Sequence, residues 1–170
     1  MKRHPVLIPL SHEHRQALFA AQIIKYGISR YKGAPTTTQE KLAYIQSFHQ
    51  EQLGTHFQFE EEVLFPLVRG RDDIIDRLLT ELAEEHALII AHMNTLDQGD
   101  DCEQKLDRLG HALEAHIRKE ERQFFERLQA VLGDEGLMKL KPHVESYQVM
   151  DRMCRTELSR TAPSETPTPN

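Results

Sequence analysis

A short phrase of one histidine and two acids occurs twice in this chain. It reads His-Phe-Gln-Phe-Glu-Glu at residues 56–61 and His-Ile-Arg-Lys-Glu-Glu at residues 116–121. In both copies the first acid lies four residues after the histidine. Four residues of α-helix turn through about 400°, so the imidazole and this carboxylate share one helical face, one turn apart. Each phrase therefore provides half of a metal site.

Ionisable side chains lie inside the apolar stripe of every long helical segment. In the first segment, steps of three and four residues from Leu10, Ala17 and Ala21 lead to His14, whereas His12 points about 160° away. The same counting places these ionisable side chains in one bundle interior: His14, His56, Glu60, His86, His116 and Glu120.

So many buried ionisable side chains are more than a small bundle tolerates without compensation. One such residue alone would be interpreted as a core histidine or a member of a buried ion pair. Each unpaired buried ion costs several kcal/mol, whereas a whole domain is stable by only about 5–15 kcal/mol. Divalent cations compensate this cost, because they accept imidazole nitrogens and are neutralised by carboxylates that bridge them. The pattern therefore predicts metal binding.

The ligand atoms narrow the choice of metal. Nitrogen and oxygen donors without sulfur disfavour copper(I) and a thiolate zinc site, and no His-Glu-x-x-His phrase supports a metalloprotease-type zinc site. The Glu-x-x-His spacing of ferritin-like di-iron proteins is also absent, since none of the four histidines has a glutamate three residues before it. Two metals that share two carboxylates suit iron or manganese. Iron is the expected metal, with manganese or zinc as substitutes.

Composition excludes several classes of partner. The chain has 170 residues, 28% of them charged, and a net charge of −6. This balance disfavours nucleic acid and an anionic membrane surface as partners. No stretch approaches the roughly 18 apolar residues of a membrane span, and residues 1–10 do not resemble a signal peptide. Cys102 and Cys154 stand far apart, so no disulfide framework is indicated and a cytoplasmic protein is expected.

The periodicity predicts an all-α fold. Four helical segments, at about residues 9–31, 37–66, 72–97 and 101–132, are joined by short turns, which is typical of an antiparallel up-down four-helix bundle. Ser11 is expected to cap the first segment, and Thr37 with Glu40 forms a capping box for the second. Pro66 is expected to kink or end the second segment. A weaker helical extension follows at residues 137–158. The bundle domain is thus expected at residues 1–158, and residues 159–170 are expected to be a disordered tail.

These phrases together resemble the hemerythrin family, in its bacterial hemerythrin-like (HHE cation-binding) branch. The resemblance covers about residues 10–132 and rests on Glu13-His14, residues 56–61, Glu85-His86 and residues 116–121. It implies a non-haem di-iron centre inside the bundle, with oxo or carboxylate bridges. Carried over by position, it implies one iron on the first two histidines, one on the last two, and two bridging carboxylates: His14 with His56, His86 with His116, and Glu60 with Glu120.

The chain departs from the oxygen-carrying members of that family. These have a second histidine four residues after the one on the third helix, where this chain has Ile90. His92 lies about 240° round the helix from His86 and does not simply replace it. The carriers also place their last acid five residues after the histidine of the fourth helix. Helical geometry here favours Glu120 over Glu121, although both acids are present. Simple reversible oxygen transport is therefore not implied.

Several neighbours of the ligands have weaker roles. His49 is expected to be a core histidine or to support a ligand rather than to bind metal itself. Glu61 and Glu121 would either orient ligand imidazoles or be solvated surface acids. The walls of the site, which would control access, are expected to be Phe57, Phe65, Ile89, Ile90, Ile117 and Phe124.

Three functions are compatible with this pattern. The leading one is a small di-iron protein that binds or senses O2, NO or a reactive oxygen species such as peroxide, or handles iron, with a separate protein partner as its output. The alternative is a di-iron oxidoreductase that reduces peroxide or nitric oxide or repairs iron centres, so an enzymatic role stays open. A third is an interaction bundle without metal, whose stability would not suffer from loss of His56 or Glu60.

Overall fold

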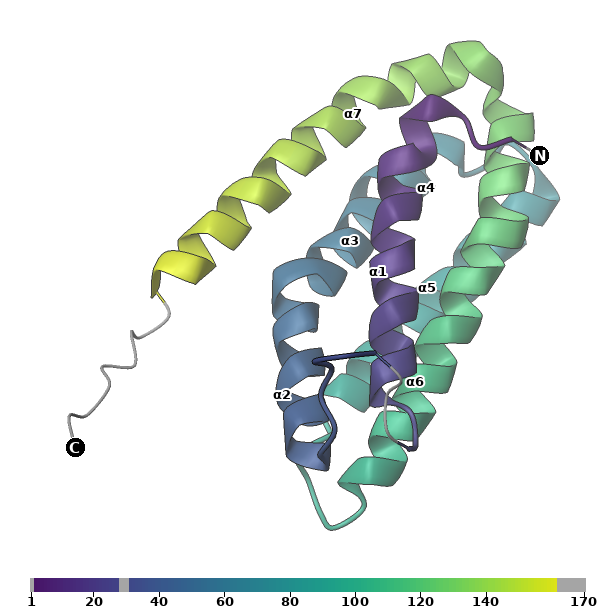
Figure 1. The fold of residues 1–170 in the computed structure, drawn as a ribbon. Coiled ribbons are helices and arrows are strands. Elements are labelled where there is room, and N and C mark those ends of the chain that lie inside the picture. Colours follow the sequence, from purple (N-terminus) through teal and green to yellow (C-terminus); the bar gives the residue numbers. More distant parts are fainter. Residues whose placement is uncertain (1, 28–30, 162–170) are drawn as a thin grey trace.

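The computed structural model describes residues 2–27 and 31–161, and for residues 151–161 only the backbone. Within these residues every regular element is helical, which confirms the all-α prediction. Figure 1 shows the helices side by side in an up-and-down arrangement, with the last helix bending over the top of the bundle. Of the disordered tail predicted for residues 159–170, residues 159–161 are instead the helical end of the last helix, and residues 162–170 lie outside the described residues.

Four helical columns form the bundle. The first is α1 (Ile8–Ile24), which follows the short 3-10 turn η1 (Pro5–Leu7). The second column contains two π-helical turns and consists of α2 (Thr38–Phe48), η2 (His49–Leu53), α3 (Gly54–Phe59), η3 (Glu60–Leu64) and α4 (Phe65–Val68). The third is α5 (Asp73–Met93). The fourth joins α6 (Cys102–Lys119), the π-helical turn η4 (Glu120–Phe124) and the first part of α7 (Phe125–Thr161).

Local hydrogen bonds explain where the helices begin. The capping box predicted for the second column is confirmed, because Thr37 accepts a bond from the Glu40 backbone and Glu40 accepts one from the Thr37 backbone. Asp72 caps α5 by accepting bonds from two backbone N–H groups. The cap predicted at Ser11 is wrong. Proline residues at the N-terminus start the first helix earlier, and the Ser11 hydroxyl instead donates to Glu121 at 2.7 Å.

The first helix ends at Ile24, earlier than the periodicity predicts. Lys25 is already extended, and the buried Lys41 ammonium donates to the carbonyls of Lys25 at 2.6 Å and of Gly27 at 2.8 Å. A cation that binds carbonyls just after a helix favours ending the helix there. Tyr31, the last residue of the predicted segment, is non-helical and 50% exposed, and residues 28–30 lie outside the described residues.

The second column continues past Pro66 and ends at Val68, so the predicted end at Pro66 is wrong. The π-helical turn η3 immediately precedes it, and the Phe65 N–H donates to the Glu60 carbonyl, five residues back. Proline has no N–H to place in the helical pattern, so a wider turn next to it absorbs the missing bond. A matching π-helical turn begins at Glu120 in the fourth column. Both predicted bridging carboxylates thus stand at the start of a π-helical turn.

Two apolar clusters fill the bundle, one at each end. One contains Leu10, Leu82 and Phe124, and the other contains Ala17, Ile89 and Ile117. On α1, His14 lies between Leu10 of one cluster and Ala17 of the other. In the same way, His86 lies between Leu82 and Ile89 on α5, and Glu120 lies between Ile117 and Phe124 on the fourth column. The core is therefore interrupted by one polar layer across all four columns.

The last helix turns back over the bundle at Gly133. This residue has φ of 58°, a left-handed conformation that favours glycine, and it kinks α7. Beyond the kink, apolar residues at helical spacing are buried against the bundle: Leu137, Leu140, Val144 and Tyr147. We name residues 137–147 the C-terminal arm. The predicted helical extension is thus present in the described residues as a continuation of the fourth column (Figure 1).

Gly110 permits the close approach of α1 and α6. A Cβ atom there would lie 2.8 Å from the Ala21 carbonyl oxygen and 2.8 Å from Cγ of Lys25. Gly110→Ala is expected to lower the free energy of unfolding by about 1–2 kcal/mol, because overpacking outweighs the better helix propensity of alanine. Urea denaturation measures this, with Ala115→Ser on the exposed face of α6 as the control. Equal or greater stability of Gly110→Ala would show that the helices separate easily.

Glu114 joins the same two helices electrostatically. Its carboxylate pairs with Lys25 and with Arg118, and these contacts lower its pKa from 4.5 to about 2. A carboxyl group whose pKa is lower in the folded state contributes stability above its unfolded pKa and loses it as pH falls toward the folded pKa. Glu114→Gln should therefore be less stable than wild type at pH 6, and the difference should shrink between pH 4.5 and about 2. A difference that stays constant in acid unfolding would contradict this assignment.

Candidate metal centre

The polar layer contains every residue predicted to bind metal, and we call these six residues the inner cluster: His14, His56, Glu60, His86, His116 and Glu120. All are at most 3% exposed. They fall into two overlapping groups of four that share Glu60 and Glu120, and in each group the ligand atoms lie within 4.8 Å of one another. Each column contributes at least one residue. The structure thus brings the six predicted side chains together.

The four imidazoles face each other in two pairs. The Nε2 atoms of His14 and His56 are 3.0 Å apart, and those of His86 and His116 are 3.1 Å apart. Two imidazole nitrogens bound to one metal at about 2.1 Å and at a right angle would be about 3.0 Å apart. The spacing within each pair therefore fits a single shared metal ion.

The two buried carboxylates lie between these pairs. One oxygen of Glu60 is 3.5 Å from Nε2 of His56, and the other is 3.4 Å from Nε2 of His86. Glu120 approaches one histidine of each pair with a single oxygen, Oε2, which is 3.2 Å from Nε2 of His14 and 3.5 Å from Nε2 of His116. Both carboxylates are fully buried, and none of their oxygens has a hydrogen-bond donor. Buried carboxylate oxygens without donors are costly, so this arrangement suits a cation between the two histidine pairs.

A second shell of acids holds the imidazoles from outside, and we call it the outer carboxylates: Glu13, Glu61, Glu85 and Glu121. Each lies 2.7–2.9 Å from the Nδ1 atom of one histidine of the inner cluster. Because a carboxylate accepts hydrogen bonds, Nδ1 carries the proton and donates it. Imidazoles that are neutral in this way present the lone pairs of Nε2 to one another. Lone pairs only 3 Å apart repel each other unless a proton or a metal ion lies between them, and a metal ion there is the usual arrangement of metal-bound histidine.

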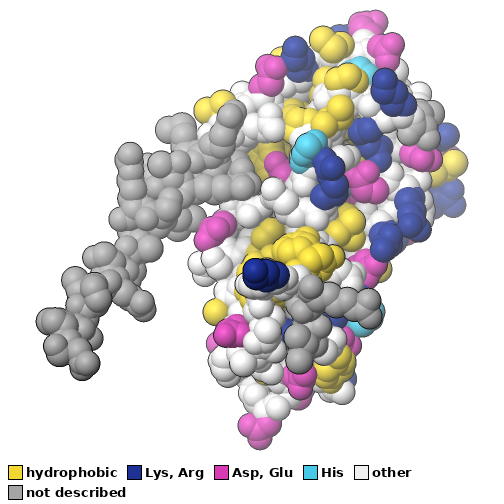
Figure 2. Space-filling view, in the orientation of Figure 1, with side chains coloured by type: hydrophobic (Ala, Val, Ile, Leu, Met, Phe, Trp, Pro, Cys, Tyr) yellow, Lys and Arg dark blue, Asp and Glu magenta, His cyan; other side chains and the backbone are white. Residues whose placement is uncertain are grey.

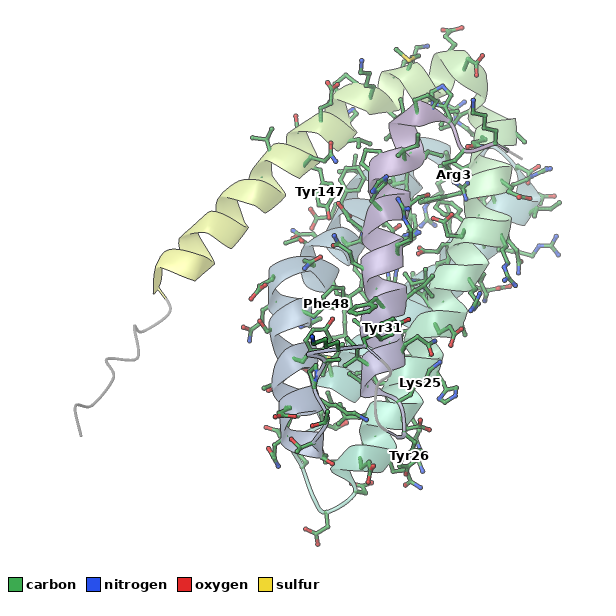
Figure 3. All side chains as sticks on the ribbon, viewed as in Figure 1. Arg3, Lys25, Tyr26, Tyr31, Phe48 and Tyr147 are labelled. Carbon is green, nitrogen blue, oxygen red and sulfur yellow. The ribbon has the colours of Figure 1, made fainter. Side chains whose placement is uncertain are left out.

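The balance of charge also favours cations. Six carboxylates surround the four imidazoles, while Arg3 and Lys119 are the cationic side chains in contact with them among the described residues. This leaves four negative charges, which two divalent cations would balance. Arg3 reaches the site from the N-terminal segment, beside the fourth column (Figure 3), and its guanidinium also lies 4.8 Å from the Phe125 ring centroid.

The ionisation of the site follows from this charge. Burial opposes protonation of His14, but Glu120, Glu121 and Glu60 outweigh it and raise the pKa of His14 well above its usual value. His86 has its pKa raised for the same reason, with Glu60 as the carboxylate that raises it most. Burial raises the pKa of Glu60, yet the neighbouring histidines lower it well below the ordinary range. The layer therefore attracts positive charge strongly, either protons or metal ions.

The site has an approximate two-fold repeat. Glu13 precedes His14 and bonds His56, and Glu85 precedes His86 and bonds His116. The outer acids of the two phrases cross over in the same way, so that Glu121 bonds His14 and Glu61 bonds His86. The first two columns are thus repeated by the last two, as the repeated phrase in the sequence indicates.

Sequence reasoning assigned only part of this surrounding shell. Glu61 and Glu121 do orient imidazoles, which settles the choice between that role and solvated surface acids. Glu13 and Glu85 were assigned no role, although the repeated Glu-His phrase contains both. Glu120 belongs to the inner cluster and Glu121 does not, as helical geometry predicts.

The apolar walls are aromatic, with one correction. Phe57 stacks on His86 at a centroid distance of 3.9 Å, and Phe65 lies parallel to the same ring at 5.9 Å. Phe125, which was not predicted, stacks on His14 at 5.0 Å. The prediction that Ile90 lines the site is wrong, because it is 37% exposed on the outer face of α5. The helical turn that buries His86 buries Ile89 rather than Ile90.

The remaining histidines lie apart from the inner cluster. His49 is half-buried in η2, and burial lowers its pKa. Neither His49 nor His92 joins a group of potential metal ligands among the described residues. Figure 2 shows that acidic, basic and hydrophobic side chains are interspersed on one outer face of the molecule. None of the described helices is both long and apolar enough to cross a membrane.

A four-helix bundle with an inward histidine from every column and inward glutamates from the second and fourth columns defines a cation-binding helical bundle. Comparison with family models gives the same result, because residues 7–128 match the Hemerythrin family, described as the hemerythrin HHE cation binding domain. The chain therefore belongs to the hemerythrin HHE cation-binding family, as the resemblance in its sequence implies. Neither the curated proteins nor the solved structures that were compared gave a match.

Proposed function

We propose that this protein holds two iron ions in the inner cluster and uses them to bind a small ligand. The observation that carries the proposal is the pairing of Nε2 atoms at 3.0 and 3.1 Å across two shared, donor-free carboxylates. That arrangement supplies two nitrogen ligands to each of two positions and two oxygen bridges between them. Nitrogen and oxygen donors without sulfur suit iron, with manganese or zinc as substitutes.

Each of the two proposed ions is assigned to one pair of histidines. His14 and His56 would hold one ion, and His86 and His116 would hold the other. The carboxylates of Glu60 and Glu120 would bridge both. The outer carboxylates keep each Nδ1 protonated and each Nε2 directed inward. Iron, when bound, would supply redox chemistry and coordination positions that protein ligands do not fill.

The size of the space beside the cluster supports a small ligand. A cavity of about 10 Å³ lies against His56 and Glu13, and its other walls include Phe48 and Gln52. That volume holds about one water molecule. Because the six ligands are also at most 3% exposed, we propose O2, NO or peroxide, rather than a larger organic molecule, as the species that is bound or sensed. A role in iron handling uses the same ligands, and a sensor would pass its state to a separate protein partner.

The experiment is an absorption spectrum of the iron-loaded protein, first with air, then after dithionite, and then with NO. We expect a near-ultraviolet band that dithionite bleaches and that NO replaces with a different spectrum. If the absorption spectrum of the iron-loaded protein is the same in air, after dithionite and with NO, the proposal of ligand binding is overturned. Sustained consumption of peroxide or NO under reductant would instead support the oxidoreductase alternative.

A further inference from the structure

The C-terminal arm reaches the candidate metal centre through one side chain. Tyr147 lies on α7, 14 residues after the kink at Gly133, and is only 9% exposed. Its ring stacks on the ring of Phe59 at a centroid distance of 4.5 Å. Phe59 directly precedes Glu60 in the chain. Figure 3 shows Tyr147 between α7 and the columns formed by α1 and α3. Tyr147 lies outside residues 7–128, which match the family, whereas Phe59 lies within them.

The Tyr147 hydroxyl is bonded to an outer carboxylate. It donates to Oε2 of Glu13 at 3.0 Å, and the same oxygen accepts the bond from Nδ1 of His56 at 2.7 Å. Two donors from different elements thus converge on one oxygen atom. A carboxylate fixed by two donors has less freedom to rotate, so the Tyr147 hydroxyl fixes the direction in which His56 presents Nε2.

The corresponding acid at the other half of the repeat is held differently. Glu85 accepts from Nδ1 of His116 at 2.9 Å, and its other oxygen pairs with Lys119 at 2.5 Å. Lys119 belongs to α6, within the bundle itself. The His86–His116 pair is therefore oriented by the four columns alone, whereas the His14–His56 pair also depends on the arm.

We propose that Tyr147 is a positioning residue that couples the packing of the C-terminal arm to metal binding by His56. The inference rests on the proposed function, because it needs a metal at the His14–His56 pair. Coupling of this kind is reciprocal. Metal binding, which fixes His56 and Glu13, stabilises the packed arm, and loss of the arm contact weakens metal binding. The arm is thus one part of the described chain through which occupancy of the centre changes the outer surface.

The test compares wild type with Tyr147→Phe, which keeps the ring on Phe59 and removes only the hydroxyl. Tyr44→Phe is the matched control, because Tyr44 is a half-buried tyrosine that packs near Phe48 on α2. Fe²⁺ affinity is measured anaerobically by competition with a chromogenic chelator. We expect Tyr147→Phe to weaken Fe²⁺ binding about three- to tenfold, less than the 10–100-fold typical of a direct partner of a ligand. Tyr44→Phe should bind as wild type does.

Hydrogen exchange of residues 137–147 supplies a readout other than affinity. Iron should slow exchange of the arm in wild type and in Tyr44→Phe, and this protection should be lost in Tyr147→Phe. In the metal-free protein, the Nδ1–H resonance of His56 should also shift in Tyr147→Phe. Unchanged affinity, arm protection and His56 resonance in Tyr147→Phe would overturn the coupling while the proposed function stands. Failure of wild type to bind iron would overturn the proposed function itself.

Discussion

Glu60→Gln is expected to abolish binding of the metal pair while leaving the bundle folded. Glu60 is shared by both groups of ligands, and each of its oxygens faces a different histidine pair. Glutamine has nearly the same size but is uncharged and a poor bridging ligand, so both metal positions lose a negative oxygen donor. Elemental analysis of the purified variant should find less than a tenth of the wild-type metal, and circular dichroism should show unchanged helix content.

Glu61→Gln is the matched control for this substitution. Glu61 is adjacent in sequence but 46% exposed at its side chain, and it contacts only the outer nitrogen of His86. Loss of such a partner weakens metal binding by about 10–100-fold without removing a ligand. Glu61→Gln should therefore still load with metal when metal is in excess. If Glu60→Gln retained both metals, Glu60 would not be a bridging ligand.

Removal of the metal is expected to destabilise the protein strongly. A ligand present at 1,000 times its Kd stabilises the folded state by about 4 kcal/mol, and the proposed centre has two sites. For a domain of about 150–250 residues, each kcal/mol corresponds to about 2–4 °C in Tm. The metal-loaded protein should therefore melt at least about 10 °C above the chelator-treated protein.

The expected loss of stability has its physical reason in the buried charge of the inner cluster. Without metal, the layer holds two carboxylates with no hydrogen-bond donor and imidazoles whose nitrogens face each other at 3.0 Å. Scanning calorimetry of the loaded and metal-free forms measures the difference, and the same comparison on Glu60→Gln should show no shift. Equal melting temperatures of the two wild-type forms would favour the interaction bundle without metal.

Helical periodicity is enough to direct the six side chains of the inner cluster into one interior, because each spacing that it uses is local. His56 and Glu60 share a face one turn apart, and this holds in the structure even though a π-helical turn begins at Glu60. The repeat in the sequence likewise predicts that His116 and Glu120 occupy the matching positions. The bundle architecture determines which helices are neighbours. No knowledge of contacts between distant residues is therefore needed to bring the six side chains together.

Contacts between distant segments explain what periodicity misses. Tyr147 bonds Glu13 across 134 positions of sequence, and Arg3 bonds Glu121 across 118. No spacing rule connects such pairs. Ile90 shows a different failure, because it lies at the edge of the buried stripe of α5, which passes through His86, Ile89 and Met93. The early end of α1 depends on Lys41, whose ammonium arrives from the second column.

The most direct test of the metal centre is elemental analysis of untagged protein purified in air, with protein concentration measured independently. The account predicts about two iron atoms per chain, and fewer than one in Glu60→Gln prepared in parallel. A folded wild-type protein with no metal even after anaerobic loading with Fe²⁺ would contradict it. So would a single metal ion that survives the loss of Glu60.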